Sequence, residues 1–352
     1  MKSWTFYSKH LERVSRSFSF CIAQLKSPQK EWIGLSYLLF RIADTIEDSS
    51  WIDQKIQFSQ FDIFEQALVS PPSQKTSLMH WIDNFPLDIP DSEKLLLNDT
   101  HSLLSDLFSL PIPIRTQIQK NVLEMMKGMR YFLKNHTLNG ELVLTNLPLL
   151  NQYCFFVAGL VGELLTVFFV KGLNEIESNE QRLVDAFHFG LFLQKVNILK
   201  DQLKDESLGR QFISSREQLR ASVNQHAFHA LSYIKSLPIK EGKTFRVFCA
   251  WSLFIGLASL KWIDKSYDNK KNYKISKTET MGIILNLKSI INSNDALDKL
   301  FKKYLRLEEY ENQKKTLANE KPNAKLPSWF LNIYSSTPLN SHAQELGLIE
   351  IG

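Results

Sequence analysis

Apolar residues recur at helical spacing along most of the chain, and strand-like alternation is hard to find. The stretches of helix length are residues 28–48, 92–108, 114–134, 148–171, 178–206, 215–236, 241–265, 278–292 and 295–312. Segments rich in proline and polar residues separate them, as in SPPSQK at 70–75. The pattern predicts one all-α domain over residues 1–312, followed by an irregular or partly mobile tail at 313–352.

One predicted helix, in the stretch LLFRIADTIEDSS at 38–50, is apolar around most of its girth but carries a narrow polar stripe. Asp44, Glu47 and Asp48 are spaced i, i+3 and i+4, so they project from one side. Arg41 and Tyr37 lie one and two turns earlier on that side. An ordinary surface helix has a broad polar face, so this helix is expected to be buried with its stripe facing a cavity.

A second helix, FGLFLQKVNILKDQLKD at 189–205, has the same design. Gln194, Asn197, Asp201 and Asp205 advance by three or four residues, and apolar side chains cover the remaining faces. Either acidic cluster by itself would more often be a solvated surface feature. Two such stripes on apolar helices instead favour an arrangement in which they face each other across a wet interior cavity.

Carboxylates that face each other in a cavity repel, so a cation is expected between them. Their hard oxygen ligands suit Mg²⁺, and the sequence offers no Cys/His cluster for zinc. Arg16, Arg41 and Arg210 would face phosphate oxygens from the rim, where a guanidinium binds bidentately. The pattern therefore predicts a site for a metal and a phosphorylated substrate.

Composition narrows the class of partner. The chain has 352 residues and a net charge of +5, but its lysines and arginines are interleaved with acidic residues. That balance favours an anionic small molecule or a membrane surface over nucleic acid. Cys21, Cys154 and Cys249 are far apart and predict buried free thiols of a reducing compartment.

The N-terminus lacks the apolar region of a secretory signal. The most apolar stretches, at 153–170 and 247–262, are expected to be buried helices, because Glu163 interrupts the first and the second is short. No stretch after residue 312 is long and apolar enough for an anchor. The expected location is therefore cytoplasmic, as a monomer, with peripheral contact at a membrane surface.

Five stretches in order carry a resemblance to a known family. They are VSRSF at 14–18, YLLFRIADTIED at 37–48, MKGMRYFLKNH at 126–136, YCFFVAGLVGE at 153–163 and GLFLQKVNILKDQLKDESLGRQF at 190–212. Together they are similar to the motifs of the squalene and phytoene synthase family, and the similarity covers most of residues 10–290. Within that family, LFLQKVNI and YCFFVAGLVG resemble squalene synthase more than phytoene synthase.

The resemblance implies an isoprenoid synthase fold, a helical bundle around a central cavity, that couples two molecules of farnesyl diphosphate head-to-head. The implied Mg²⁺ ligands are Asp44, Glu47 and Asp48 for one diphosphate, and Asn197, Asp201 and Asp205 for the other. The implied diphosphate-binding residues are Arg16, Tyr37, Arg41, Gln194 and Arg210. Phe18 and Phe40 would line the chain-binding cavity, and Tyr153 would guide a proton transfer.

In a second half-reaction, hydride from NADPH would convert presqualene diphosphate to squalene, with Asn197, Lys274 and Lys277 near the cofactor. The sequence departs from the family at three places. Lys200 replaces the usual arginine, Lys204 replaces an acidic residue, and the loop at 274–277 lacks the arginine of reducing enzymes. These departures bear on the reductive step more than on the coupling.

Three functions stay open on the sequence. The first is a squalene synthase, and the second is a non-reducing relative that yields presqualene diphosphate, dehydrosqualene or phytoene. The third is a non-catalytic helical assembly protein with this fold. A protein of that last kind is expected to have lost acidic ligands, whereas Asp44, Asp48, Asp201 and Asp205 are all present here.

Overall fold

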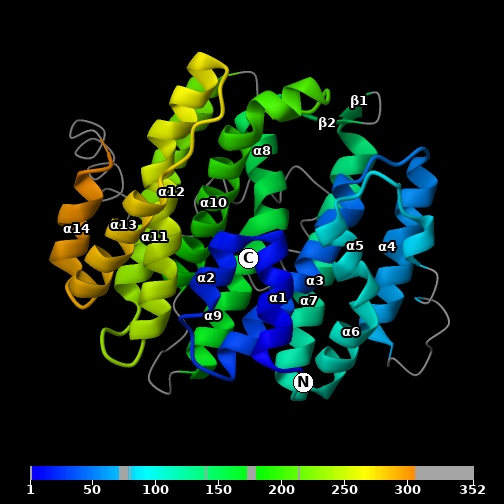
Figure 1. Ribbon diagram of the computed structural model, residues 1–352, viewed down its shortest axis with the longest axis horizontal. Coiled ribbons are helices and arrows are strands. Elements are labelled where there is room, and N and C mark those ends of the chain that lie inside the picture. Colours follow the sequence, from blue (N-terminus) through cyan, green and yellow to red (C-terminus); the bar gives the residue numbers. More distant parts are fainter. Residues whose placement is uncertain are drawn as a thin grey trace, which may run out of the picture.

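Helices build almost the whole protein, as a computed structural model shows (Figure 1). The structure describes residues 2–70, 78, 81–138, 141–172, 180–212 and 215–305, without the side chains of residues 148, 172 and 180. The helices in the first half are α1 (Trp4–Val14), α2 (Arg16–Ile22), α3 (Gln29–Asp48), α4 (Gln54–Val69), the 3-10 helix η2 (Ile82–Asn84), α5 (Asp91–Asn98), α6 (Thr100–Ser109) and α7 (Ile112–Asn135). Those in the second half are α8 (Leu147–Cys154), the π-helix η3 (Phe155–Gly159), α9 (Leu160–Gly172), α10 (Glu180–Ser207), α11 (Arg216–Ser236), α12 (Lys243–Asn269), α13 (Lys277–Ile290) and α14 (Asn294–Lys302).

The prediction of an all-α fold is confirmed, and both helices that carry polar stripes lie within it. α3 begins directly after Pro28 and ends where Ser49 turns to extended backbone. Most of its side chains are buried against the surrounding helices, so α3 is a core helix. α10 crosses the middle of the molecule beside α8, α9 and α11 (Figure 1). The predicted tail at 313–352 lies outside the described residues.

Two predicted helices are wrong in detail, because each is interrupted. The stretch 92–108 is two helices, α5 and α6, which meet at Asp99. Asp99 Oδ2 lies 2.9 Å from His10 Nε2 of α1, so a tertiary contact occupies the junction. The stretch 148–171 is α8, η3 and α9 in series. Such π-helical turns often occur beside functional sites, and this one directly follows Tyr153 and Cys154.

Three short strands, which the sequence did not predict, connect distant parts of the chain. β1 (Thr137–Leu138) pairs antiparallel with β2 (Glu141–Leu144), and β2 pairs parallel with β3 (Gln211–Phe212). β3 comes just after the end of α10, and β1 and β2 come just after α7. The parallel pairing therefore holds the end of α10 against the hairpin that follows α7.

Close contacts between helix backbones hold α9 and η3 against α10. A Cβ atom on Gly190 of α10 would overlap the carbonyl oxygen of Ala158 in η3. A Cβ atom on Gly162 of α9 would overlap the carbonyl oxygen of Ala186 in α10. Since only glycine fits at these crossings, the apolar run 153–170 lies directly on the helix that carries the second acidic stripe.

The two apolar stretches belong to helices long and apolar enough to cross a membrane by length and composition. They are Leu149–Lys171 and Lys243–Asn269, and 61% of the apolar window of each is buried inside the fold. Core helices of globular proteins pass the same test, in keeping with the predicted burial. The three cysteines are buried and free, as predicted.

The glycine contact predicts a stability difference between two Gly→Ala variants. Gly190→Ala forces helix backbones apart and is expected to lower the free energy of unfolding by about 1–3 kcal/mol. Gly282→Ala in α13 is the matched control, because a Cβ there meets nothing within 4 Å. The control should gain up to about 1 kcal/mol from helix propensity. Urea unfolding measures both, and equal stability of the two variants would contradict the close contact.

Candidate active site

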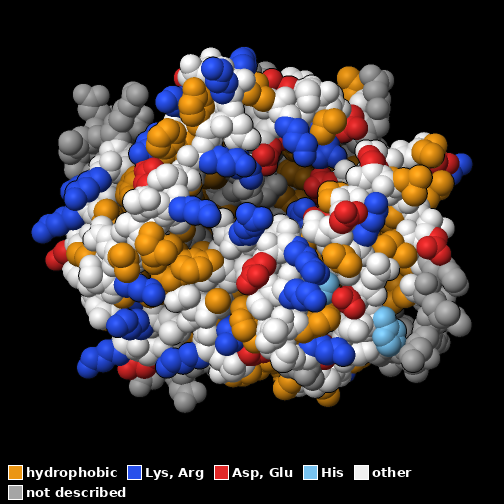
Figure 2. Space-filling view, viewed as in Figure 1, with side chains coloured by type: hydrophobic (Ala, Val, Ile, Leu, Met, Phe, Trp, Pro, Cys, Tyr) orange, Lys and Arg blue, Asp and Glu red, His pale blue; other side chains and the backbone are white. Residues whose placement is uncertain are grey.

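The ends of α3 and α10 meet beside a hollow in the molecular surface. Figure 2 shows this hollow over α8 and α10, with basic and acidic side chains around its rim. Arg210, two residues before Phe212 of β3, joins the two helix ends: its Nη1 donates to Asp48 Oδ1 at 2.9 Å and its Nη2 to the Asp48 carbonyl oxygen at 3.0 Å. Its Nε donates to Glu141 Oε2 of β2 at 3.1 Å. The structure thus brings the two sequence motifs together through one arginine.

Burial of carboxylates dominates the electrostatics of this region. Burial raises the pKa of Asp44 to about 7, although the Arg41 guanidinium opposes the shift. It also raises the pKa of Asp205 to about 6, again against a nearby arginine, Arg210. Burial and the charges of Asp48 and Asp44 hold the pKa of Glu47 well above its usual range. Burial therefore disfavours the charged form of these carboxylates, and the nearby arginines do not restore their ordinary pKa values.

Tyr153 of α8 lies at the inner side of the first acidic cluster. Its hydroxyl donates to Glu47 Oε2 at 3.3 Å, and the side chain is buried. Burial and the neighbouring carboxylates hold the pKa of this phenol well above its usual range, so it stays protonated and acts as a donor. The other carboxylate oxygen, Glu47 Oε1, is buried and has no hydrogen-bond partner among the described residues.

A residue that the sequence analysis missed fixes Arg41. Glu93 of α5 is buried, and its Oε1 accepts from Arg41 Nε at 3.1 Å and from Arg41 Nη2 at 2.7 Å. Its other oxygen accepts from the Thr45 hydroxyl at 3.2 Å. These bonds leave Arg41 Nη1 directed at Asp44, 3.8 Å from Oδ2. Arg41 was predicted to lie at the rim and face phosphate. In the structure its Nε and Nη2 are bound to Glu93, and only Nη1 is directed elsewhere.

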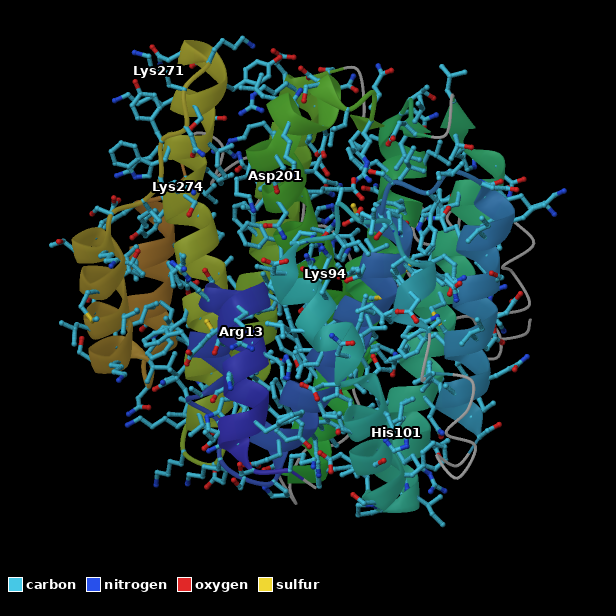
Figure 3. All side chains as sticks on the ribbon, turned by 45° about the vertical axis from the view of Figure 1, so that its right-hand side comes forward. Arg13, Lys94, His101, Asp201, Lys271 and Lys274 are labelled. Atoms are coloured by element: carbon cyan, nitrogen blue, oxygen red, sulfur yellow. The ribbon has the colours of Figure 1, made fainter. Side chains whose placement is uncertain are left out.

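The side chains of the second stripe are partly exposed to solvent. The Asp201 side chain is 46% exposed and lies 3.1 Å from Lys200 Nζ. Lys200 also donates to Asn197, which is exposed, and Gln194 is half-buried. Figure 3 shows Asp201 on α10 at about the height of Lys274 beside α12. Asn197 and Asp201 are thus accessible to solvent, as a water-filled cavity would also leave them, and the facing of the two stripes across such a cavity stays a prediction.

The remaining predicted residues lie at different depths. Phe40 is buried, and Phe18 packs on Tyr37 with ring centroids 5.5 Å apart, so all three are in or against the core. Arg16 is exposed on α2. The residues predicted for the cofactor, Lys274 and Lys277, are also exposed, before and at the start of α13.

The acidic residues fit Mg²⁺ bound together with a phosphorylated ligand. Within the described residues, no three His, Cys, Asp or Glu side chains form a group ready to hold a metal ion. Mg²⁺ in phosphoryl sites, however, uses one or two carboxylates and completes its shell with water and phosphate oxygens. The unpartnered Glu47 Oε1 and the raised pKa values of Asp44 and Asp205 fit such an ion. Asn197, on the same stripe as Asp201, has an amide oxygen that could serve as a further metal ligand.

A buried polar cluster, also missed from the sequence, joins α8, α10 and α11 below the site. Lys195 of α10 is fully buried, and its ammonium donates to Asn151 of α8 and to Ser222 of α11. Lys195 Nζ also lies 2.8 Å from His226 Nε2 of α11. Burial lowers the pKa of Lys195 to about 7. In the sequence this lysine is one polar residue in an apolar run, which gives no sign of its three partners.

Comparison with known proteins finds relatives that all belong to one family. Residues 11–254 match the family model for squalene/phytoene synthase. The squalene synthase of Saccharomyces cerevisiae is 28% identical over 312 residues, which cover 80% of this chain and 66% of that protein. The squalene synthase of Mycosarcoma maydis is 28% identical over 319 residues, which cover 78% of this chain and 53% of that protein. The chain thus spans about half to two thirds of the length of these two relatives.

Solved structures share the fold. A ligand complex of TcSQS has a TM-score of 0.66 at 20% identity, over 88% of this chain and 98% of that one. A ligand complex of a dehydrosqualene synthase has a TM-score of 0.53 at 19% identity, over 82% and 96%. The predicted resemblance is confirmed, and since the family match covers more than half of the sequence, the chain belongs to the squalene/phytoene synthase family.

Proposed function

We propose that the protein condenses two farnesyl diphosphates head-to-head to presqualene diphosphate and reduces this intermediate with NADPH to squalene. The observation that carries the proposal is the joining of the two acidic helix ends, in which Arg210 lies 2.9 Å from Asp48. A reaction that ionises two diphosphates in turn needs acidic metal ligands and cations on both sides of one cavity. The family membership of the chain supports the same reaction.

Loss of diphosphate is the first requirement of the chemistry. Mg²⁺ bound by Asp44, Glu47, Asp48, Asn197, Asp201 and Asp205 would supply positive charge that stabilises the departing group. Arg41, held by Glu93, and Arg210, held by Glu141, are fixed donors beside those carboxylates. Because both guanidiniums are positioned before substrate arrives, they need little rearrangement to stabilise the developing charge.

The cation left at C1 must be protected from water while the second substrate attacks it. We assign the buried Phe40 and Phe18, which packs beside Tyr37, to the wall of the chain-binding cavity, because ring faces stabilise nearby cations. Tyr153, fixed by its hydrogen bond to Glu47, presents a protonated hydroxyl at a set position. We assign Tyr153 to the proton transfer that closes the cyclopropane ring: the phenol oxygen would accept the proton lost from carbon while the phenol's own proton passes to Glu47 Oε2, to which it is hydrogen-bonded.

The reduction with NADPH is the more specific part of the proposed function. Lys274 and Lys277 are exposed and make no ion pair among the described residues, so their charges are available to an anionic cofactor. Asn197 would lie on the substrate side of that cofactor. A non-reducing enzyme is the alternative. Two departures from the family favour it: Lys200 stands where the family usually has arginine, and the loop at 274–277 lacks the arginine of reducing enzymes. The monomeric state and the cytoplasmic location of the protein stay predictions.

Product analysis separates the two enzymes. The purified protein is incubated with farnesyl diphosphate and Mg²⁺, with and without NADPH, and the extracted lipids are analysed by gas chromatography and mass spectrometry. Squalene is expected only with NADPH. Presqualene diphosphate or a dehydrogenated C30 product under both conditions would discard the reductive step, and no turnover would favour the assembly protein.

Loss of a carboxylate from either stripe should remove coupling. Asp44→Asn and Asp201→Asn are each expected to lower kcat for presqualene diphosphate formation by about 10²-fold or more, because each loses a charge that would bind Mg²⁺. Asp88→Asn, at an exposed position outside both stripes, is the control. Activity is measured against Mg²⁺ concentration, and full activity of either site variant would remove that residue from the ligand set.

Glu93 should act as a positioning residue for Arg41. Glu93→Gln weakens a charge-assisted hydrogen bond and is expected to raise KM for farnesyl diphosphate by about tenfold. Glu12→Gln, at an exposed position of α1, is the control. Steady-state kinetics and thermal unfolding are measured together. A lower melting temperature with unchanged KM would show that Glu93 only supports the fold.

A further inference from the structure

One face of α13 presents two apolar side chains between two lysines. Lys277, Met281, Leu285 and Lys288 are spaced by three or four residues, so they follow one side of the helix. Met281 is 50% exposed and Leu285 60% exposed. A Cβ atom on Gly282, beside Met281, would meet nothing within 4 Å. No described residue covers this part of α13.

The same surface continues onto α12 and α2. Lys288 Nζ lies 5.2 Å from the ring centroid of Trp251 in α12. Trp251 also stacks on Phe20 of α2, whose ring centroid lies 4.8 Å away and whose side chain is 40% exposed. Figure 2 shows apolar side chains gathered over α12 and α13, with Lys and Arg side chains around them. Phe20, Met281 and Leu285 therefore form the exposed apolar part of one surface.

Positive charge is concentrated in the segment that leads into α13 and along α13 itself. Residues 270–288 contain five lysines and one glutamate, which amounts to +4 of the chain's formal +5. The glutamate is already paired, since Glu279 lies 2.6 Å from Lys261 and accepts from the Trp262 indole at 3.0 Å. Figure 3 shows Lys271 and Lys274 along the segment that leads from α12 to α13.

We propose that Phe20, Met281 and Leu285, with Lys277 and Lys288, form a docking surface for a lipid bilayer that contains anionic lipids. Exposed apolar side chains with lysines beside them can enter the interface of a bilayer while their ammonium groups contact lipid phosphates. Each lysine near an anionic surface adds about a fivefold gain in affinity. The apolar part of the surface, Phe20, Met281 and Leu285, contains none of the residues assigned to the proposed reaction, whereas Lys277 is also assigned to the cofactor.

A second copy of the chain fits this surface poorly. In a symmetric contact the same patch meets itself, so the lysines of one copy would lie against those of the other. Like charges in an interface oppose association. An anionic bilayer supplies the opposite charge, and its interior accepts Met and Leu side chains without a matching pocket.

The test is flotation of the purified full chain with vesicles of phosphatidylcholine alone or with about 30% phosphatidylglycerol, a content that gives a negative surface potential. Binding is expected with the anionic vesicles and should fall in 1 M salt, where the Debye length is about 3 Å. Met281→Ser combined with Leu285→Ser should lower the partition coefficient by about tenfold or more. Leu87→Ser combined with Ile112→Ser, at exposed apolar positions away from α13, should leave it unchanged.

Four results would overturn the proposal. These are no binding, equal binding to both kinds of vesicle, binding that survives the Met281/Leu285 change, and a dimer in analytical ultracentrifugation that this change abolishes. Circular dichroism verifies that the variants fold. Turnover of farnesyl diphosphate is measured without vesicles in the same variants, so failure of the proposed reaction is recorded separately from failure of the docking surface.

Discussion

Burial of neighbouring carboxylates, opposed only in part by two arginines, is the constraint on which the rest of this structure depends. Asp44 and Glu47 are on the inner side of α3, and Asp48 and Asp205 approach each other where α3 and α10 end. Two arginines enter this region, and each is itself bound to a further glutamate. Arg210 pairs with Asp48, but Glu47 Oε1 has no hydrogen-bond partner among the described residues, so the buried carboxylates are compensated only in part.

The short sheet and the glycine contacts hold this charged arrangement in place. Carboxylates that repel would move apart if their helices were loosely packed. The β2–β3 pairing holds the end of α10, and Arg210 ties it to Asp48. At Gly162 and Gly190 the backbones of α9, η3 and α10 touch, so packing is closest along the helix that carries the second stripe. The stretch YCFFVAGLVGE therefore combines a candidate site residue, Tyr153, with Gly162, whose lack of a side chain lets two helices touch.

The sequence predicts the helices that carry the stripes because each is a long apolar run in which polar residues recur at helical spacing. It fails where tertiary contacts decide. The break at Asp99 depends on His10, and β1 and β3 are too short to show alternation. Glu93 is an acidic residue in the first turn of α5, a common position near a helix N-terminus, so nothing marks it as the partner of Arg41. The solvent exposure of Asp201 likewise depends on what surrounds the end of α10.

The buried lysine has a mechanical consequence for the two helices that it joins. Apolar side chains in contact allow one helix to slide a little along another, since dispersion forces have no preferred direction. The Lys195 ammonium binds Asn151 of α8 and Ser222 of α11 directionally, and a shift along the axis would strand a charge in the interior. α8, α10 and α11 therefore move as one rigid part. The separation of Tyr153 on α8 and Asp201 on α10 is therefore fixed by the same buried contacts.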